Sequence, residues 1–208
     1  MKKAIKLFSL FFVLTLPLTL LFSCKDNQNE QNDEPKYTEL PAYDTSKLSD
    51  YIEPFEYTGL SIEKAEGTSD ADAVWSAVIS NAKIKLYPKD QLAYYEEQEI
   101  IKYKYFASKE DVDYDELLKS MGVTEESIKN DAKALVKKDL VLLYIVNDAS
   151  LSLTDAEKQT YLDKYAEKFV EIYGYDKEYV KTNMEKQIYE AMLYDKASEY
   201  LIINNNIT

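Results

Sequence analysis

From residue 69 to residue 203 the chain repeats one pattern: a helix-capping residue, followed by apolar residues three and four positions apart. A capping side chain accepts hydrogen bonds from the first free backbone N–H groups of a helix. The spacing of three and four residues places the apolar side chains on one helical face. The pattern therefore predicts an all-α domain. The expected helices cover approximately residues 70–81, 88–108, 113–121, 124–147, 154–173 and 177–203.

Particular residues mark the ends of these helices. Ser69 and Thr124 are expected N-caps, and residues 154–157, Thr-Asp-Ala-Glu, form a capping box. Pro88 is expected at the first helical position, where a missing N–H costs nothing. Gly122 is expected to end a helix, because glycine adopts the left-handed conformation without strain.

The distribution of apolar residues indicates where the core lies. Residues 140–146 are apolar on all sides and are expected at its centre. On the helix over residues 88–108, apolar residues spread over more than one face. That helix is either buried between neighbours, or one of its faces contacts a partner.

The segments on either side of the helices are different in character. Residues 37–68 contain Pro41, Pro54 and Gly59 and predict an extended linker arm with one strand, packed along another part of the molecule. The polar residues 204–206, three asparagines, are expected to fray.

The N-terminus reads as a secretory signal. Lys2, Lys3 and Lys6 precede an apolar run over residues 7–22, and a small residue, Ser23, stands beside Cys24. Residues 21–24 resemble the lipobox of bacterial lipoproteins, in which the cysteine thiol receives diacylglycerol and the bond before it is cut. The resemblance implies cleavage between Ser23 and Cys24, lipid on Cys24, and anchoring on the outer, extracytoplasmic face of a membrane.

The expected organisation therefore has four parts. Residues 1–23 are the signal peptide, and residues 24–36 form a disordered tether because they have no apolar side chain to bury apart from Cys24. Residues 37–68 are the extended linker arm, and residues 69–208 form the helical domain.

Composition excludes several classes of function. A formal net charge of −13 disfavours binding to nucleic acid. The chain has no histidine and no arginine, and Cys24 is its only cysteine. There is consequently no Ser-His-Asp triad, no imidazole ligand for a metal and no free thiol nucleophile once Cys24 is lipidated. We expect no cofactor and no metal.

Three patterns resemble enzymatic or metal sites and fit a simpler interpretation. Residues 80–83 have the S-x-x-K spacing, but the companion S-D-N and K-T-G elements of penicillin-recognising enzymes are absent. The acidic loop over residues 110–116 lacks the spacing and the central glycine of an EF-hand. Adjacent carboxylates such as Glu96 and Glu97 are interpreted as solvated helix faces. The sequence therefore predicts a protein that is not an enzyme.

The order of these signals resembles the linker and C-terminal peptide-binding domain of trigger factor chaperones and the related SurA-like domains. The resemblance covers about residues 50–203. It depends on segments 51–62, 74–88, 121–126, 134–137, 140–145, 153–157 and 196–197.

The resemblance implies long helices that form arms around a cradle, and binding of unfolded or partly folded polypeptides. Between Ile62 and Ser69 there is no room for the prolyl isomerase domain of trigger factors, and the ribosome-binding domain is also missing. Parvulin-type isomerases rely on histidines that this chain lacks. The implied function is therefore a holdase for exported polypeptides without isomerase activity. A non-enzymatic adaptor that docks one folded partner is the alternative.

Binding to unfolded chains requires scattered apolar residues rather than a fixed constellation. The candidate contact residues lie on the second and fifth expected helices, and each of them also suits core packing. They are Leu92, Tyr95, Ile101, Tyr103, Tyr105, Phe106, Tyr161, Tyr165 and Tyr173.

Overall fold

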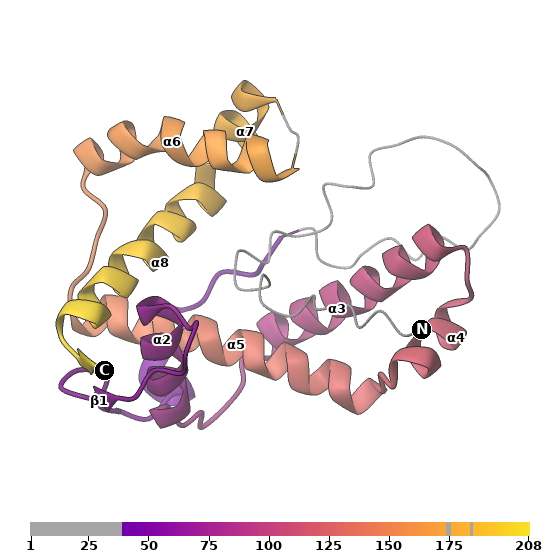
Figure 1. Ribbon diagram of the computed structural model, residues 1–208, viewed down its shortest axis with the longest axis horizontal. Helices are drawn as coiled ribbons and strands as arrows, with labels where there is room; N and C mark the ends of the chain where they lie inside the picture. The colour runs from indigo at the N-terminus through magenta and orange to yellow at the C-terminus, as the bar shows by residue number, and fades with distance from the viewer. Residues whose placement is uncertain (1–38, 174–175, 184) are drawn as a thin grey trace.

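The computed structural model describes residues 39–173, 176–183 and 185–208, and this part of the chain is mostly helical (Figure 1). The predicted all-α class is therefore confirmed. The predicted signal peptide, the predicted lipidation site at Cys24 and the predicted tether all lie outside the described residues. The α-helices are α1 Leu48–Tyr51, α2 Asp70–Asn81, α3 Lys89–Glu110, α4 Tyr114–Met121, α5 Glu125–Asp148, α6 Asp155–Tyr173, α7 Lys177–Asn183 and α8 Glu185–Ile203.

The predicted caps explain why the helices begin where they do. The Ser69 hydroxyl accepts from the N–H of Asp72 at 3.1 Å, and the Thr124 hydroxyl accepts from the N–H of Ser127 at 3.1 Å. Gly122 ends α4 with a φ of +68°. Pro88 differs from the prediction, because it is the N-cap of α3 in an extended conformation and precedes the first turn.

The body of the molecule is built around one core. In it meet α2, the N-terminal half of α3, α5 from Ala132 onward, the C-terminal half of α8 and the preceding arm. Residues 140–145 of the apolar stretch predicted for the centre of the core lie in this core. The fully buried side chains of this core include Ile52, Val74, Trp75, Val78, Val136, Leu140, Val141, Ile145 and Leu201.

The arm before α2 combines extended chain with short elements, a 3-10 helix at Thr45–Lys47, α1 and the strand β1 at Ser61–Ile62. It is held to the helices at several points. The phenol of Tyr57 donates to Asp148 at 2.5 Å, and a single backbone bridge joins Ile52 to Ile84.

The C-terminal tail is ordered, so the expectation that it frays is wrong. The strand β2, Asn206–Ile207, pairs with β1 in parallel. The Asn205 side chain accepts from the N–H of Leu60 at 2.8 Å and donates to the carbonyls of Tyr57 and Leu201 at 3.0 and 2.7 Å. The polar side chain of Asn205 thus binds backbone groups of the arm, which are far away in the sequence.

A second, smaller core joins α6, α7 and the N-terminal half of α8 around Ala166, Val180, Ile188 and Met192. The helix expected over residues 177–203 is described on both sides of Met184, as α7 and α8, and Met184 itself is outside the described residues. In Figure 1, α8 leaves the end of α5 at the body and diverges from it, carrying α6 and α7 away from the body.

Candidate polypeptide-binding surface

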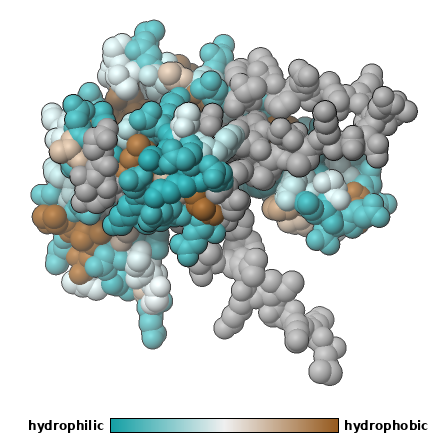
Figure 2. All heavy atoms as spheres, turned by 90° about the horizontal axis from the view of Figure 1, so that it is seen from above, coloured by the Kyte–Doolittle hydropathy of each residue, from teal (hydrophilic) through white to brown (hydrophobic). Residues whose placement is uncertain are grey.

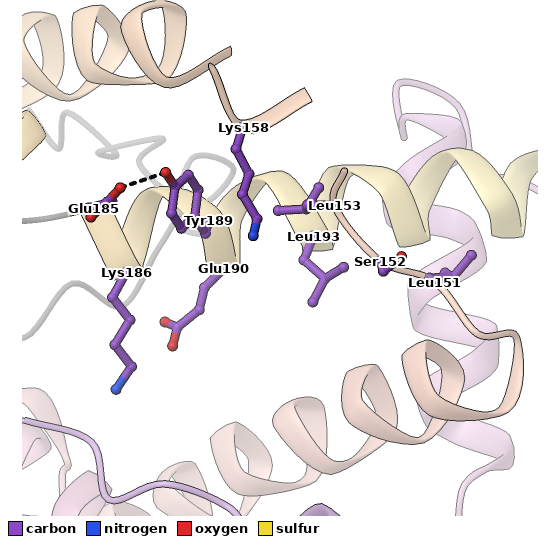
Figure 3. Close-up of a pocket in the computed structure, with 9 residues that line it drawn as sticks. All are labelled: Leu151, Ser152, Leu153, Lys158, Glu185, Lys186, Tyr189, Glu190 and Leu193. Atoms are coloured by element: carbon purple, nitrogen blue, oxygen red, sulfur yellow. Dashed lines mark hydrogen bonds between the residues drawn. The ribbon is translucent and has the colours of Figure 1, made fainter. Parts of the chain in front are cut away.

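A pocket of about 570 Å³ lies where α8 diverges from α5, and we call it the α8 pocket (Figure 3). One side is the linker between α5 and α6 with the start of α6, and the other side is the N-terminal half of α8. Its lining residues are Leu151, Ser152, Leu153, Lys158, Glu185, Lys186, Tyr189, Glu190 and Leu193.

Side chains at the base of α8 fix its direction. The ring of Tyr194 stacks on Trp75 with centroids 4.8 Å apart, and the Trp75 indole N–H donates to the Ser198 hydroxyl at 2.8 Å. The Lys138 ammonium of α5 lies 5.0 Å from the centre of the Tyr194 ring. Because Trp75 is fully buried, these contacts hold α8 against α2 and α5 at one end.

A lysine ties the linker and the start of α6 to α8. The Lys196 ammonium donates to the Ser152 carbonyl and to the Glu157 carboxylate, both at 2.7 Å. Glu157 also accepts from the backbone N–H of Thr154 at 2.6 Å. The bond from Lys196 and those from Thr154 lower the pKa of Glu157 to about 2. The linker side of the pocket is therefore held in place by the capping box that begins α6.

The interior of the α8 pocket combines apolar surface with a polar rim. Leu151, Leu153 and Leu193 are only partly buried and offer apolar surface. The phenol of Tyr189 donates to Glu185 at 2.6 Å, a bond that raises the pKa of Tyr189 (Figure 3). Such a surface accepts apolar side chains, while its rim remains hydrated.

Acidic groups lie between α8 and the body. Figure 3 shows Lys186, Glu190 and Leu193 projecting from α8 toward α5. Desolvation by the surrounding helices raises the pKa of Glu190, Lys186 opposes that effect, and the Asp139 charge adds to it. Burial raises the pKa of Tyr94 on α3, and the charges of Asp139 and Glu190 raise it further.

Asp139 also holds the arm in this region. Its carboxylate accepts from the phenols of Tyr43 at 2.9 Å and Tyr95 at 2.6 Å. Burial raises the pKa of Asp139, and these two hydrogen bonds oppose the rise. One turn before Tyr95, the Gln91 amide donates to the carbonyls of Pro41 at 3.1 Å and Ala42 at 2.9 Å.

The contact residues predicted on α3 do not form one exposed face. Tyr95 and Tyr103 are buried, so in this conformation their rings are closed to a partner. Leu92 is half-buried against the body core, and Ile101 and Tyr105 are half-buried. The side chain of Phe106 is 37% exposed.

The contact residues predicted on the fifth expected helix, Tyr161, Tyr165 and Tyr173, all lie on α6, but their side chains are outside what the structure describes. The α8 pocket instead draws on Leu151, Leu153, Tyr189 and Leu193, none of which was predicted. The only signal for Tyr189 and Leu193 was their position beside the apolar stripe of their helix.

The remaining apolar surface is scattered. Figure 2 shows a mostly hydrophilic face with apolar residues in separate patches. The large apolar side chains exposed in the described part are Leu86, Phe106, Val112, Met121, Tyr179 and Ile203.

Within the described ranges, His, Cys, Asp and Glu side chains do not gather into a group of three or more that would hold a metal ion. None of the helices in those ranges combines the length and apolar character that crossing a bilayer requires. Comparisons of the chain with protein-family models, with curated proteins and with solved structures found no match.

Proposed function

We propose that this protein is a lipid-anchored, extracytoplasmic holdase that binds unfolded or partly folded exported polypeptides and has no isomerase activity. The observation that carries the proposal is the α8 pocket, which places Leu151, Leu153 and Leu193 inside a charged rim between α8 and the linker that joins α5 to α6. The placement on a membrane is supported by the signal in residues 1–23 and the lipobox at Cys24.

The fold assignment within this proposal is the peptide-binding module of the trigger factor and SurA-like type. Two groups of helices extend from the body of this protein. One is the end of α3 with α4, and the other is α6 and α7 together with α8 (Figure 1). Arms of this kind would allow a client chain to contact several small apolar surfaces at once.

The size of the pocket fits weak, exchangeable binding. An aromatic side chain buries about 150–250 Å². At about 25 cal/mol per Å², this contributes roughly 4–6 kcal/mol before the costs of association are subtracted. One such contact gives weak affinity, so a client is held by several contacts and released quickly.

The direct test is suppression of aggregation. The chain from Lys25 onward is mixed at near-stoichiometric ratio with several unrelated proteins diluted from denaturant, and light scattering is followed. We expect reduced scattering for most of them and no prolyl isomerase activity above background. Indifference to all clients contradicts the proposal.

A second candidate function is an adaptor for one folded partner. It is favoured by the exposed Phe106, Val112 and Met121 around the end of α3 and α4, where α4 has no buried residue in the described part. Tight capture of a single native protein, with no effect on aggregating clients, would favour this function over the holdase.

A further inference from the structure

The two cores of the molecule meet along α8. Met192 is packed in the second core, and Ala197 is packed in the body core. Lys196 lies between these two residues, so it stands at the boundary between the cores. It also follows Leu193 by three residues, which places both side chains on the same side of α8. Because Leu193 lines the α8 pocket, the Lys196 side chain lies next to that pocket.

The linker between α5 and α6 crosses the same boundary. Leu151 packs against the body core, and Leu153 packs against the second core. The N–H of Leu151 donates to a carbonyl of α5 at 2.9 Å, and Thr154 belongs to the capping box of α6, so both ends of the linker are fixed. Between these ends, the Ser152 carbonyl accepts from the Lys196 ammonium at 2.7 Å. Within the described part of the chain, residues 152 and 153 make no other hydrogen bond.

The same ammonium also reaches the start of α6. It donates to the Glu157 carboxylate at 2.7 Å. A hydrogen bond between two charged groups is stronger than one between neutral groups. The side chains of Lys196 and Glu157 are 32% and 33% exposed, so water screens the pair only in part. One lysine therefore connects α8, the middle of the linker and the first turn of α6.

We propose that Lys196 is the positioning residue of the α8 pocket. Its ammonium holds the linker against α8 and so keeps Leu151 and Leu153 opposite Leu193 (Figure 3). Without this ammonium the linker is fixed at its ends alone, and α6 and α7 move relative to the body about the boundary between the cores. The positioning is independent of the proposed function. Its consequence rests on that function, because loss of Lys196 separates the apolar side chains that a client contacts.

Distance measurements test the positioning without any client. The full chain carries p-acetylphenylalanine in place of Lys133 on α5 and of Glu171 on α6, two exposed positions, and both ketones are spin-labelled. Double electron–electron resonance then gives the distribution of distances between the body and α6. We expect Lys196→Met to widen this distribution about twofold, because methionine is similar in length and has no ammonium.

Two further variants separate the role of the ammonium from a general loss of stability. Lys196→Arg should keep the parent distribution, because a guanidinium also donates to several acceptors. Lys177→Met is the matched control, since Lys177 is 38% exposed and donates to Glu167 at 2.7 Å, but connects only α7 and α6. The proposal is overturned by parent-like distances in Lys196→Met, by equal widening in Lys196→Arg, or by equal widening in Lys177→Met.

Suppression of aggregation separates this inference from the proposed function. Lys196→Met should suppress client aggregation severalfold less than the parent chain, and Lys177→Met should match the parent. Wider distances with unchanged suppression support the positioning and contradict the α8 pocket as the site that holds clients. Reduced suppression with parent-like distances overturns the positioning and leaves the holdase standing.

Discussion

At the scale of single residues, hydrogen bonds to carboxylates connect the arm to the helices. Tyr43 and Tyr95 both donate to Asp139, and Tyr57 donates to Asp148. Hydrogen bonds to charged groups contribute more than neutral ones, because the acceptor is more strongly polarising. Each phenol thus combines ring burial with a directional bond that fixes the position of the arm.

Tyr43→Phe removes one of the two donors to Asp139 and leaves the ring in place. Because the bond is to a largely buried carboxylate, we expect the free energy of unfolding to fall by about 1.5–3 kcal/mol in urea titrations. The matched control is Tyr51→Phe, in the same arm, whose hydroxyl makes no hydrogen bond recorded in the described part. Equal effects of the two substitutions would show that Asp139 does not hold the arm.

Glu157 makes stability depend on acidity. Its pKa falls from an ordinary 4.5 to about 2, so the folded state favours the ionised form. This stabilisation is complete above pH 4.5 and is lost as the pH falls toward 2, because the unfolded state then binds the proton first. The difference in unfolding free energy between the parent chain and Glu157→Gln should shrink across this window. Glu171→Gln, an exposed substitution on the same helix, is the matched control.

At the scale of elements, the C-terminal tail and the arm stabilise each other through β1, β2 and Asn205. The two paired strands, β1 and β2, are far apart in the sequence. The pairing places the end of α8 beside the arm (Figure 1).

Asn205→Ala should lower the free energy of unfolding by about 2–4 kcal/mol, because it removes three hydrogen bonds and leaves the backbone groups of Tyr57, Leu60 and Leu201 without this partner. Asn204→Ala is the matched control, since that side chain makes one bond, to the carbonyl of Tyr200. Chemical denaturation of both variants checks the difference. A similar loss for both would contradict the account of the tail.

Local signals predicted the elements well and their long-range partners poorly. Ser69, Thr124 and Gly122 act on groups within a few residues, so their effect can be derived from sequence. Asn205 looked like part of a fraying tail because its partners lie some 145 residues away. Tyr95 looked like a contact residue because its carboxylate partner, Asp139, is on another helix. The α8 pocket depends on the direction of α8, which packing at Trp75 decides.

At the scale of the whole molecule, two separate cores divide the structure into a body and a second unit. We call the second unit the α6–α8 unit, and it consists of α6, α7 and the start of α8. The second core is small, so it contributes less stability than the first. Local opening of the α6–α8 unit is therefore expected without unfolding of the body. Such opening would change the width of the α8 pocket.

Ile188→Ala and Ile145→Ala compare the two cores, since both side chains are fully buried. Each substitution should lower the free energy of unfolding of the unit that contains it by about 2–5 kcal/mol. Hydrogen exchange should accelerate in α6, α7 and the N-terminal half of α8 alone for Ile188→Ala, and throughout α2, α5 and the C-terminal half of α8 for Ile145→Ala. If hydrogen exchange accelerates across the entire molecule in both variants, the α6–α8 unit is not a separate folding unit.

The central claim is that the α8 pocket holds unfolded polypeptides, and the most direct measurement compares two leucines. Leu193 lines the pocket, whereas Leu86 is 56% exposed and is not part of its lining. The chain with Leu193→Asp and the chain with Leu86→Asp are compared for suppression of client aggregation, after circular dichroism shows that both are folded. We predict that Leu193→Asp loses at least fivefold in suppression and that Leu86→Asp retains the parent activity. Equal suppression by the two variants would contradict the account.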